Sequence, residues 1–469
     1  MLPSIEGLGV TAILLLMGYW LGAPLIIGLF ASLAFGSTAF ATLTALGGSS
    51  PLIYTLFSLG IITAVVLRKN VLRDLGTIFM RLPAAWIVLA LTIYVIVSAG
   101  MFPRLFEGQT TAFVPVEGVI TELPLSATGG NITQTAYFTL GSLIFFAFSI
   151  LLLHEENLRF VKRGFFAFII VNASLGVIDL LAKLAGAGDI LLPIRTASYA
   201  LLTEVEQAGF WRITGGFAEA SGFGGTSLIC LAFSYAYWKA TGARFAFVLT
   251  IILLLLVLLS TSSTAYGGLA ILCLAPLASI TRSALQNRFT SDDLMIIALG
   301  IGALAVSATI FVLNERLFDP VLDLVQTTIL DKPYSESGVE RAYWNAKSLQ
   351  AFVDTNGLGI GMGSSRSSSW MISVLAQLGI VGMFAILALV LIVLRSMSGL
   401  VPTAETAEIF AFASSVRAAI VANVVAGALA GSGADPGTLF FVALSVTLAC
   451  RQLVENNRAI SRFDIRRSV

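Results

Sequence analysis

The stretch RAYWNAKSLQAFVDTNGLGIGMGSSRSSSW, residues Arg341 to Trp370, is the longest run of the chain in which polar, aromatic and glycine residues displace aliphatic ones. An apolar run of membrane-spanning length, residues 370–394, follows it at once. Glycines at every second position from 357 to 363 leave one side of an extended backbone bare, which permits close approach by a ligand or a helix. The stretch therefore predicts a polar loop at the mouth of a membrane span, and such a loop is a candidate site.

The composition is that of a membrane protein. Hydrophobic residues make up 57% of the chain and charged residues 11%, and the mean hydropathy is +0.93, far from the balance of soluble domains. Residues 1–469 are expected to form a single integral membrane domain, all-α and polytopic, with about 12–13 transmembrane helices and a large outer loop. The apolar runs lie at 8–20, 24–45, 51–67, 83–102, 135–153, 164–182, 217–238, 245–260, 264–281, 294–313, 370–394, 409–430 and 438–450.

Cations orient these runs. A cluster follows the third run and predicts a cytoplasmic loop, with Arg68, Lys69, Arg73 and Arg81. Alternation from this loop places the carboxyl terminus in the cytoplasm and three long segments on the outer face, at 103–134, 183–216 and 314–369. Long loops in a compact protein are usually functional or poorly ordered. In the third segment, Leu317–Leu330 has the spacing of an amphipathic helix, which would lie at the membrane interface or pack as a lid.

Several classes of function are disfavoured. The formal net charge of +1, without a concentrated basic face, argues against a nucleic-acid partner. The three cysteines lie inside apolar runs and suggest neither a disulfide framework nor a zinc site, and the scattered outer acids suggest no bound metal or other cofactor. The amino-terminal MLPSIEG lacks a cationic region, so the first span is expected to be retained. The glycine run lacks the preceding buried strand of a dinucleotide-binding fingerprint.

The entrance to the run at 217–238 combines an arginine, a carboxylate and several glycines, in Trp211 to Gly225. Glu219 lies within the apolar region, where an ionised group is costly unless it is paired or faces water. Arg212 and Glu219 could pair with each other to cap the span, and the glycines could serve close helix packing. These structural interpretations stand beside a functional one.

Two further arginines lie on the same predicted side of the membrane. A helix beginning near Val339 would place Arg341, Asn345 and Ser348 on one face, and Arg366 follows the glycine run. Arginine stays charged and offers a planar fork of donors, which suits a diphosphate. Arg212, Arg341 and Arg366 are therefore candidate diphosphate ligands, although each one alone could be an interfacial anchor.

Other polar residues are weaker candidates. Arg417 lies inside the run at 409–430, and an intramembrane arginine is a functional-site hypothesis, here a further diphosphate ligand. The polar turn Ser260–Thr264 is expected to cap a helix. The only histidine, His154, falls on the predicted cytoplasmic side, so proton chemistry at the outer face would rest on Glu219 or Asp354.

Taken together, these motifs resemble the O-antigen ligase and polymerase superfamily. The shared pattern is Arg212, Gly215 or Gly216, Phe217 and Glu219 at the entry to a central span, a Ser/Thr-rich turn two spans on, and a large outer loop ending in Gly-x-Gly-x-Gly-Ser-Ser-Arg. The match is best over residues 205–395. The resemblance implies a GT-C-like membrane glycosyltransferase of the bacterial inner membrane, with a periplasmic site that takes undecaprenyl-diphosphate-linked saccharides as donor and acceptor. A chain-length regulator and a flippase are further candidate partners.

Within that superfamily the resemblance favours a polymerase of exopolysaccharide or O-antigen repeats. The ligases carry a histidine in the final outer loop, where this chain has serines and Arg366. A diphosphate is a good leaving group, so the reaction needs positive charge at the departing group and a base for the incoming hydroxyl. Glu219 is the first candidate for the base and Asp354 the second. Aromatic faces could hold sugar rings or form an interfacial belt, and with Asn345 the candidates are Trp211, Tyr343 and Trp344.

Three alternatives remain open. One is ligase-type transfer of a glycan to a different acceptor. Another is a flippase or transporter for the same lipid-linked saccharide, although such a protein should show corresponding broken segments in two halves and this chain shows no such symmetry. The third is a structural or regulatory membrane subunit, which would leave the polar residues of the outer loops unexplained.

Overall fold

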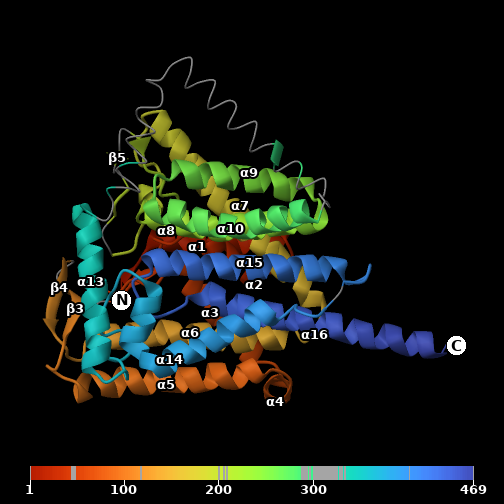
Figure 1. Ribbon diagram of the computed structural model, residues 1–469, viewed down its shortest axis with the longest axis horizontal. Coiled ribbons are helices and arrows are strands. Elements are labelled where there is room, and N and C mark those ends of the chain that lie inside the picture. The colour runs from red at the N-terminus through yellow and green to blue at the C-terminus, as the bar shows by residue number, and fades with distance from the viewer. Residues whose placement is uncertain are drawn as a thin grey trace.

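The computed structural model describes residues 2–43, 49–116, 119–198, 201–203, 206–207, 210–286, 334–400 and 402–467, with single positions between 294 and 331. Figure 1 shows long helices lying side by side along one common direction. One helix, α13 (Glu336–Asp354), and one hairpin lie across one end of this bundle. We call that end the loop end, and the other end, toward which the chain's carboxyl terminus extends, the opposite end.

The described part of the chain is predominantly α-helical. Its other α-helices are α1 (Ile5–Trp20), α2 (Pro24–Ser32), α3 (Ile53–Val66), α4 (Val71–Arg81), α5 (Pro83–Leu105), α6 (Gly129–Leu151), α7 (Glu156–Leu184), α8 (Ala220–Thr241), α9 (Arg244–Leu259), α10 (Ser263–Leu285), α14 (Trp370–Arg395), α15 (Ala407–Ala430) and α16 (Thr438–Arg467), with a short 3₁₀ helix, η2 (Leu192–Ile194). Three small antiparallel pairs complete it, namely β1 (Leu2–Pro3) with β2 (Ala41–Thr42), β3 (Thr111–Val116) with β4 (Val119–Pro124), and β5 (Glu206–Gln207) with β6 (Phe210–Trp211).

The protein is a multi-pass membrane protein by the length and composition of its helices. Among the described residues, seven helices are long and apolar enough to cross a membrane, and they are α5, α6, α7, α10, α14, α15 and the first part of α16. The pair α3 and α4, bent by 103°, would make an eighth span. The predicted all-α polytopic class is therefore confirmed.

The described residues contain seven or eight membrane-length helices, against about 12–13 predicted for the whole chain. Within the predicted span at 24–45, the structure has the nine-residue helix α2, followed by chain with turns and the short strand β2. That chain packs against the loop end, where Ser37 donates to the carbonyl oxygen of Gly216 and Thr38 to that of Ile194. Its apolar residues are thus buried in protein instead of facing lipid. The helices α1 and α9 are apolar but have only 16 residues each.

Two predictions concern segments that lie outside the described residues, except for a few isolated positions. These are the span at 294–313 and the amphipathic helix at Leu317–Leu330.

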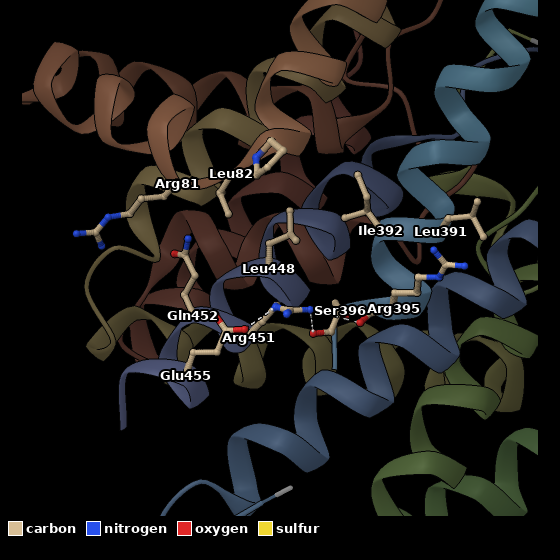
Figure 2. A pocket seen from close by; sticks show the side chains of 11 residues that line it. Arg81, Leu82, Leu391, Ile392, Arg395, Ser396, Leu448, Arg451, Gln452 and Glu455 are labelled. Carbon is tan, nitrogen blue, oxygen red and sulfur yellow. Dashed lines mark hydrogen bonds and ion pairs between the residues drawn. The ribbon is translucent and has the colours of Figure 1, made fainter. Parts of the chain in front are cut away.

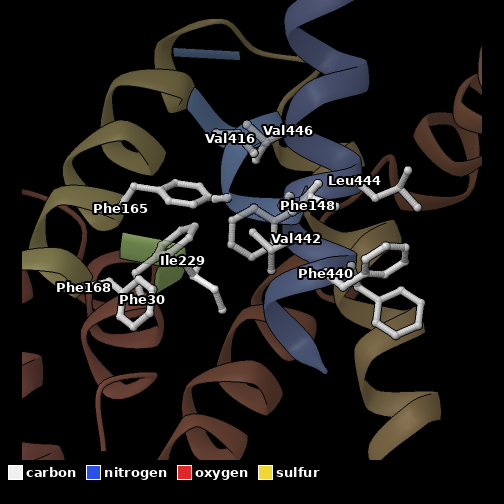
Figure 3. Close-up of a cluster of buried hydrophobic side chains, with 14 of the residues drawn as sticks. Phe30, Phe148, Phe165, Phe168, Ile229, Val416, Phe440, Val442, Leu444 and Val446 are labelled. Atoms are coloured by element: carbon white, nitrogen blue, oxygen red, sulfur yellow. The ribbon is translucent and has the colours of Figure 1, made fainter. Parts of the chain in front are cut away.

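The core lies where five helices meet around the first half of α16. Residues 440–450 of α16 are buried on every side, which is the pattern of a central helix. Figure 3 shows side chains of α2, α6, α7, α8, α15 and α16 meeting there. The ring centroids of Phe30 and Phe165 lie 4.6 Å apart, and Phe165 stacks on Phe233 at 5.1 Å. This packing fixes the ends of the helices that carry the loops described next.

Candidate functional site

The segment Thr355–Ser369, here called the glycine loop, folds back into the loop end of the bundle. Gly357, Gly359, Gly361 and Gly363 all adopt positive φ, between 78° and 92°. A Cβ atom at Gly361 would lie 2.6 Å from the carbonyl oxygen of Ser98 in α5, and one at Gly363 would lie 2.3 Å from that of Gly130 in α6. Of the two partners that the sequence allowed for the glycines, a ligand or a helix, the structure supplies helices.

The glycine loop docks on a break in α14. Gly379 has non-helical angles, φ 62° and ψ −162°, which free carbonyl groups of the preceding turn. The backbone N–H groups of Ile360 and Gly361 donate to the carbonyl oxygens of Ala376 and Gln377, at 2.9 Å each. The Gln377 amide accepts from the N–H of Gly363 at 2.7 Å and donates to the carbonyl oxygen of Ser365 at 2.7 Å. These hydrogen bonds satisfy the carbonyl groups that the break in α14 leaves free, and they hold the glycine loop in one position.

Strand β3 fixes the position of Arg366. The N–H of Arg366 donates to the carbonyl oxygen of Phe113 at 3.1 Å, and the N–H of Phe113 donates to Ser365 Oγ at 2.9 Å. Between residues 360 and 367, Arg366 is the only exposed residue. Its backbone is thus held by the hairpin, while the residue keeps exposed surface.

A buried charged network holds the backbone at Arg212. The carboxylate of Asp179, in α7, accepts from the N–H groups of Thr214 and Gly215 at 2.7 and 3.0 Å. One turn later in α7, Lys183 Nζ lies 3.1 Å from Asp179 Oδ2 and donates to the carbonyl oxygen of Arg212 at 2.7 Å. The side chains of Asp179 and Lys183 are almost completely buried.

Arg195 completes this network from the loop that precedes β5. Its guanidinium donates to the carbonyl oxygen of Gly215 at 2.6 Å and to Thr214 Oγ1 at 2.9 Å, and it pairs with Asp189. Our sequence analysis did not identify Asp179, Lys183 or Arg195. The signal was an acid and a base four residues apart at the end of the apolar run 164–182, where ionisable groups are expensive.

Arg212, Arg341, Arg366 and Glu219 all lie at the loop end, where Arg212 is within electrostatic reach of Glu219 and Arg341, and Arg366 is within reach of Glu219. Burial lowers the pKa of Arg212, Glu219 opposes that shift, and the nearby charge of Arg341 adds to it. Desolvation also lowers the pKa of Arg366, and Glu219 again opposes the shift. Glu219 therefore lies within electrostatic reach of two arginines that are far apart in sequence.

These arginines are not neutralised by partners in the described part of the chain. Arg212 Nε is buried without a hydrogen-bond partner there, and the described ion pairs include none that joins Arg212 to Glu219. The Glu219 carboxylate accepts instead from Ser221 Oγ, two residues along α8. Three guanidinium groups and one carboxylate thus leave a positive excess. An anion with several oxygens would satisfy these donors.

Helix α13 presents the predicted face to the glycine loop. Asn345 Oδ1 accepts from the N–H of Ser368 at 2.9 Å, and Ser348 is buried. Because Arg341 lies one turn before Asn345 on the same face, the helix carries it toward Arg366. Asn345 therefore connects α13 to the glycine loop through this hydrogen bond.

The aromatic candidates divide into two groups. Tyr343 donates to Glu122 Oε2 at 2.5 Å, and the rings of Tyr343 and Trp344 lie 5.9 and 6.0 Å from that of Phe113. Hydrogen bonds from Thr111, Tyr343 and Lys347 lower the pKa of Glu122 to about 2. Tyr343 and Trp344 thus brace the β3–β4 hairpin against α13. Tyr343, which is 47% exposed, and Trp211, which is 43% exposed, both keep surface that a sugar ring could contact.

Two predicted site residues do not join the cluster. Asp354 ends α13, thirteen residues after Arg341, which is about 20 Å along the helix axis. Its carboxylate accepts from Gln350 Nε2 of the same helix at 2.7 Å. Arg417 of α15 donates to the carbonyl oxygen of Leu394, in the last turn of α14 at the opposite end of the bundle. Arg417 therefore caps α14, and the prediction that it binds a diphosphate with the other arginines is corrected.

The interpretation of the polar turn Ser260–Thr264 as a helix cap is confirmed. Ser262 is the N-cap of α10, and its Oγ accepts from the N–H of Ala265 at 3.4 Å. Helix packing also accounts for Gly224, where a Cβ would lie 2.8 Å from that of Ala265.

Asp435, in the turn between α15 and α16, is a further acid at the loop end that sequence reasoning missed. Its neighbours contact the start of α14, since Trp370 Nε1 donates to the carbonyl oxygen of Ala434 at 3.1 Å and the N–H of Ser367 to that of Ser432 at 3.3 Å. Asp435 Oδ1 accepts from the N–H of Gly437 at 3.0 Å. Desolvation raises the pKa of this carboxyl to about 6.

Comparison with protein-family models finds no match for this chain, and no curated protein matches it significantly in sequence. The arguments for function therefore rest on the arrangement of its own residues.

Proposed function

We propose that this chain is a membrane glycosyltransferase that polymerises undecaprenyl-diphosphate-linked oligosaccharide repeats into exopolysaccharide or O-antigen. The observation that supports this most directly is the meeting of three arginines and one carboxylate at the loop end, none of the arginines paired within the described chain. The fold we propose is GT-C-like.

The loop end would face the periplasm and the opposite end the cytoplasm of an inner-membrane protein. Arg81 ends α4, Arg395 ends α14 and Arg451 lies near the middle of α16, and all three line one cavity at the opposite end. Such a bias is typical of the cytoplasmic side. The carboxyl terminus would then be cytoplasmic.

Arg212, Arg341 and Arg366 would hold the diphosphate of the donor. When the bond between the sugar C1 and the phosphate oxygen breaks, the negative charge on the departing lipid diphosphate grows. Guanidinium groups fixed in advance stabilise that charge more than they stabilise the bound substrate, which lowers the barrier. The buried network under Arg212 and the hairpin clamp on Arg366 supply this rigidity.

Glu219 would act as the general base. The hydroxyl oxygen of the acceptor sugar forms the new bond to C1, its proton passes to the Glu219 carboxylate, and undecaprenyl diphosphate leaves. Glu219 is half-buried at the start of α8 and lies in reach of Arg212 and Arg366. A base in this place would stand next to the bond that breaks.

Cells that lack the gene test this proposal. Complementation with wild type, Arg212→Ala, Arg341→Ala, Arg366→Ala or Glu219→Ala is followed by measurement of polymer length, with membrane levels of each variant checked. We expect single lipid-linked repeats to accumulate on the outer face with each well-expressed variant. Accumulation of intact repeats on the inner face would identify a flippase instead. Normal chains that are no longer attached to their final acceptor would identify a ligase.

A further inference from the structure

A second cluster of arginines surrounds a cavity at the opposite end of the bundle, far from the site described above. The cavity has a volume of about 330 Å³ and lies between the corner of α4 and α5, the end of α14, and α16. Figure 2 shows the side chains that line it. Arg81 comes from the end of α4, Arg395 from the end of α14, and Arg451 from α16.

The cavity carries an excess of positive charge. Its one carboxylate, Glu455, pairs with Arg451 at 2.8 Å. Arg451 also donates to the carbonyl oxygen of Ser396 at 3.0 Å, so its guanidinium is held against the wall. Arg81 and Arg395 make no hydrogen bond or ion pair through their side chains in the described part of the chain, and both are exposed. Two cations are therefore left for an anion to bind.

The remaining wall is mainly apolar and continuous with the spans. Its apolar residues include Leu82, Leu391, Ile392 and Leu448, and its polar residues are Ser396 and Gln452. Leu391 is 49% exposed on α14, a helix of membrane-spanning composition. The amphipathic helix α4, bent by 103° from α3 and with Leu72 and Met80 exposed, has the character of an interfacial helix. The cavity thus lies where a span ends and the headgroup layer begins.

We propose that this cavity binds an anionic phospholipid of the adjacent leaflet. The anionic headgroup lies at the rim of the cavity in the field of Arg81, Arg395 and Arg451, and an acyl chain follows Leu82, Ile392 and Leu448. An alternative role for Arg81 and Arg395 is favourable interaction with the dipoles of the helices that they end. That role would not require a cavity beside these arginines. A pocket that joins unpaired cations to an apolar wall matches a molecule with an anionic head and an apolar tail.

The test uses the delipidated full-length protein and native mass spectrometry with phosphatidylglycerol or phosphatidylcholine of identical acyl chains. Wild type is expected to retain phosphatidylglycerol preferentially, and Arg81→Gln/Arg395→Gln to lower that preference about thirtyfold, because each arginine near an anionic lipid contributes on the order of fivefold. The matched control Arg73→Gln/Arg282→Gln removes two exposed cations outside the cavity and should leave the preference intact.

A second variant tests the apolar wall without changing charge. Leu448→Trp should fill the cavity and reduce phosphatidylglycerol retention while thermal unfolding confirms that the protein is folded. Equal loss in the Arg73→Gln/Arg282→Gln control would show diffuse attraction and overturn the proposal. Sodium phosphate that displaces phosphatidylglycerol completely, or unchanged retention in both cavity variants, would also overturn it, the former by identifying a soluble anion as the ligand.

Discussion

The ammonium group of Lys183 donates a hydrogen bond of 2.7 Å to the backbone carbonyl oxygen of Arg212. It also lies 3.1 Å from the carboxylate of Asp179, which accepts from the backbone of Thr214 and Gly215. One buried ion pair thereby holds the segment that carries a candidate diphosphate ligand. Buried pairs contribute little net stability but are costly to break on one side.

Replacement of Lys183 by Met should therefore destabilise the protein by about 3 kcal/mol or more, because a buried carboxylate loses a partner. The double variant Asp179→Leu/Lys183→Leu should be less destabilised than either single variant, since it removes both charges. Thermal unfolding in detergent measures the effect, with Lys69→Met at an exposed position as the control. Equal stability of Lys183→Met and wild type would contradict the role given to the network.

Gly363 should tolerate no side chain. An alanine Cβ would combine a φ of 78° with a contact of 2.3 Å to the carbonyl oxygen of Gly130. Gly399 has a similar φ of 76° with nothing within 4 Å of the added Cβ. Gly363→Ala is expected to be less stable than Gly399→Ala by about 2 kcal/mol, the cost of overpacking alone. If the two variants unfold at the same temperature, the glycine loop does not pack on α6 as described.

Asp435 should make stability depend on pH. Burial raises its pKa from 3.8 to about 6, so the folded state binds a proton that the unfolded state loses at lower pH. Stability is therefore greatest below about pH 4 and falls as pH rises to about 6, by roughly 3 kcal/mol. Asp435→Asn should raise the unfolding temperature at pH 7.5 but not at pH 4. A loss of stability at both pH values would show that the carboxylate is stabilised in the folded protein.

Arg417→Gln should leave polymer length unchanged in complemented cells. Its guanidinium caps the carbonyl oxygen of Leu394 at the opposite end of the bundle, so removal affects stability without touching the loop end. We expect a lower unfolding temperature with normal chains. Single repeats accumulating in this variant, at normal membrane levels, would return Arg417 to the site.

The sequence predicted the all-α membrane class and the candidate arginines because both follow from local composition and from which side of the membrane each loop lies on. It did not predict the supports beneath them. Asp435 lies in an Asp-Pro-Gly turn that looks solvent-exposed, and the residues before it contact Ser367 and Trp370, more than sixty residues earlier in the chain.

An apolar run in the sequence does not distinguish a segment buried inside the protein from one that crosses the lipid bilayer. Residues 24–43 are apolar because α2 and the chain after it pack inside the bundle, against Gly216 and Ile194. The sequence allowed a helix as the partner of the glycine loop but could not identify α14, because that contact depends on the break at Gly379.

The most direct test of the proposed polymerase is reconstitution of the purified protein in vesicles with one undecaprenyl-diphosphate-linked repeat. We predict that wild type forms a ladder of longer saccharides and releases undecaprenyl diphosphate. Arg212→Ala and Arg366→Ala should abolish the ladder, and the fold control Arg417→Gln should retain it. Movement of the repeat across the bilayer without any ladder, or a ladder undiminished by loss of either Arg212 or Arg366, would contradict the account.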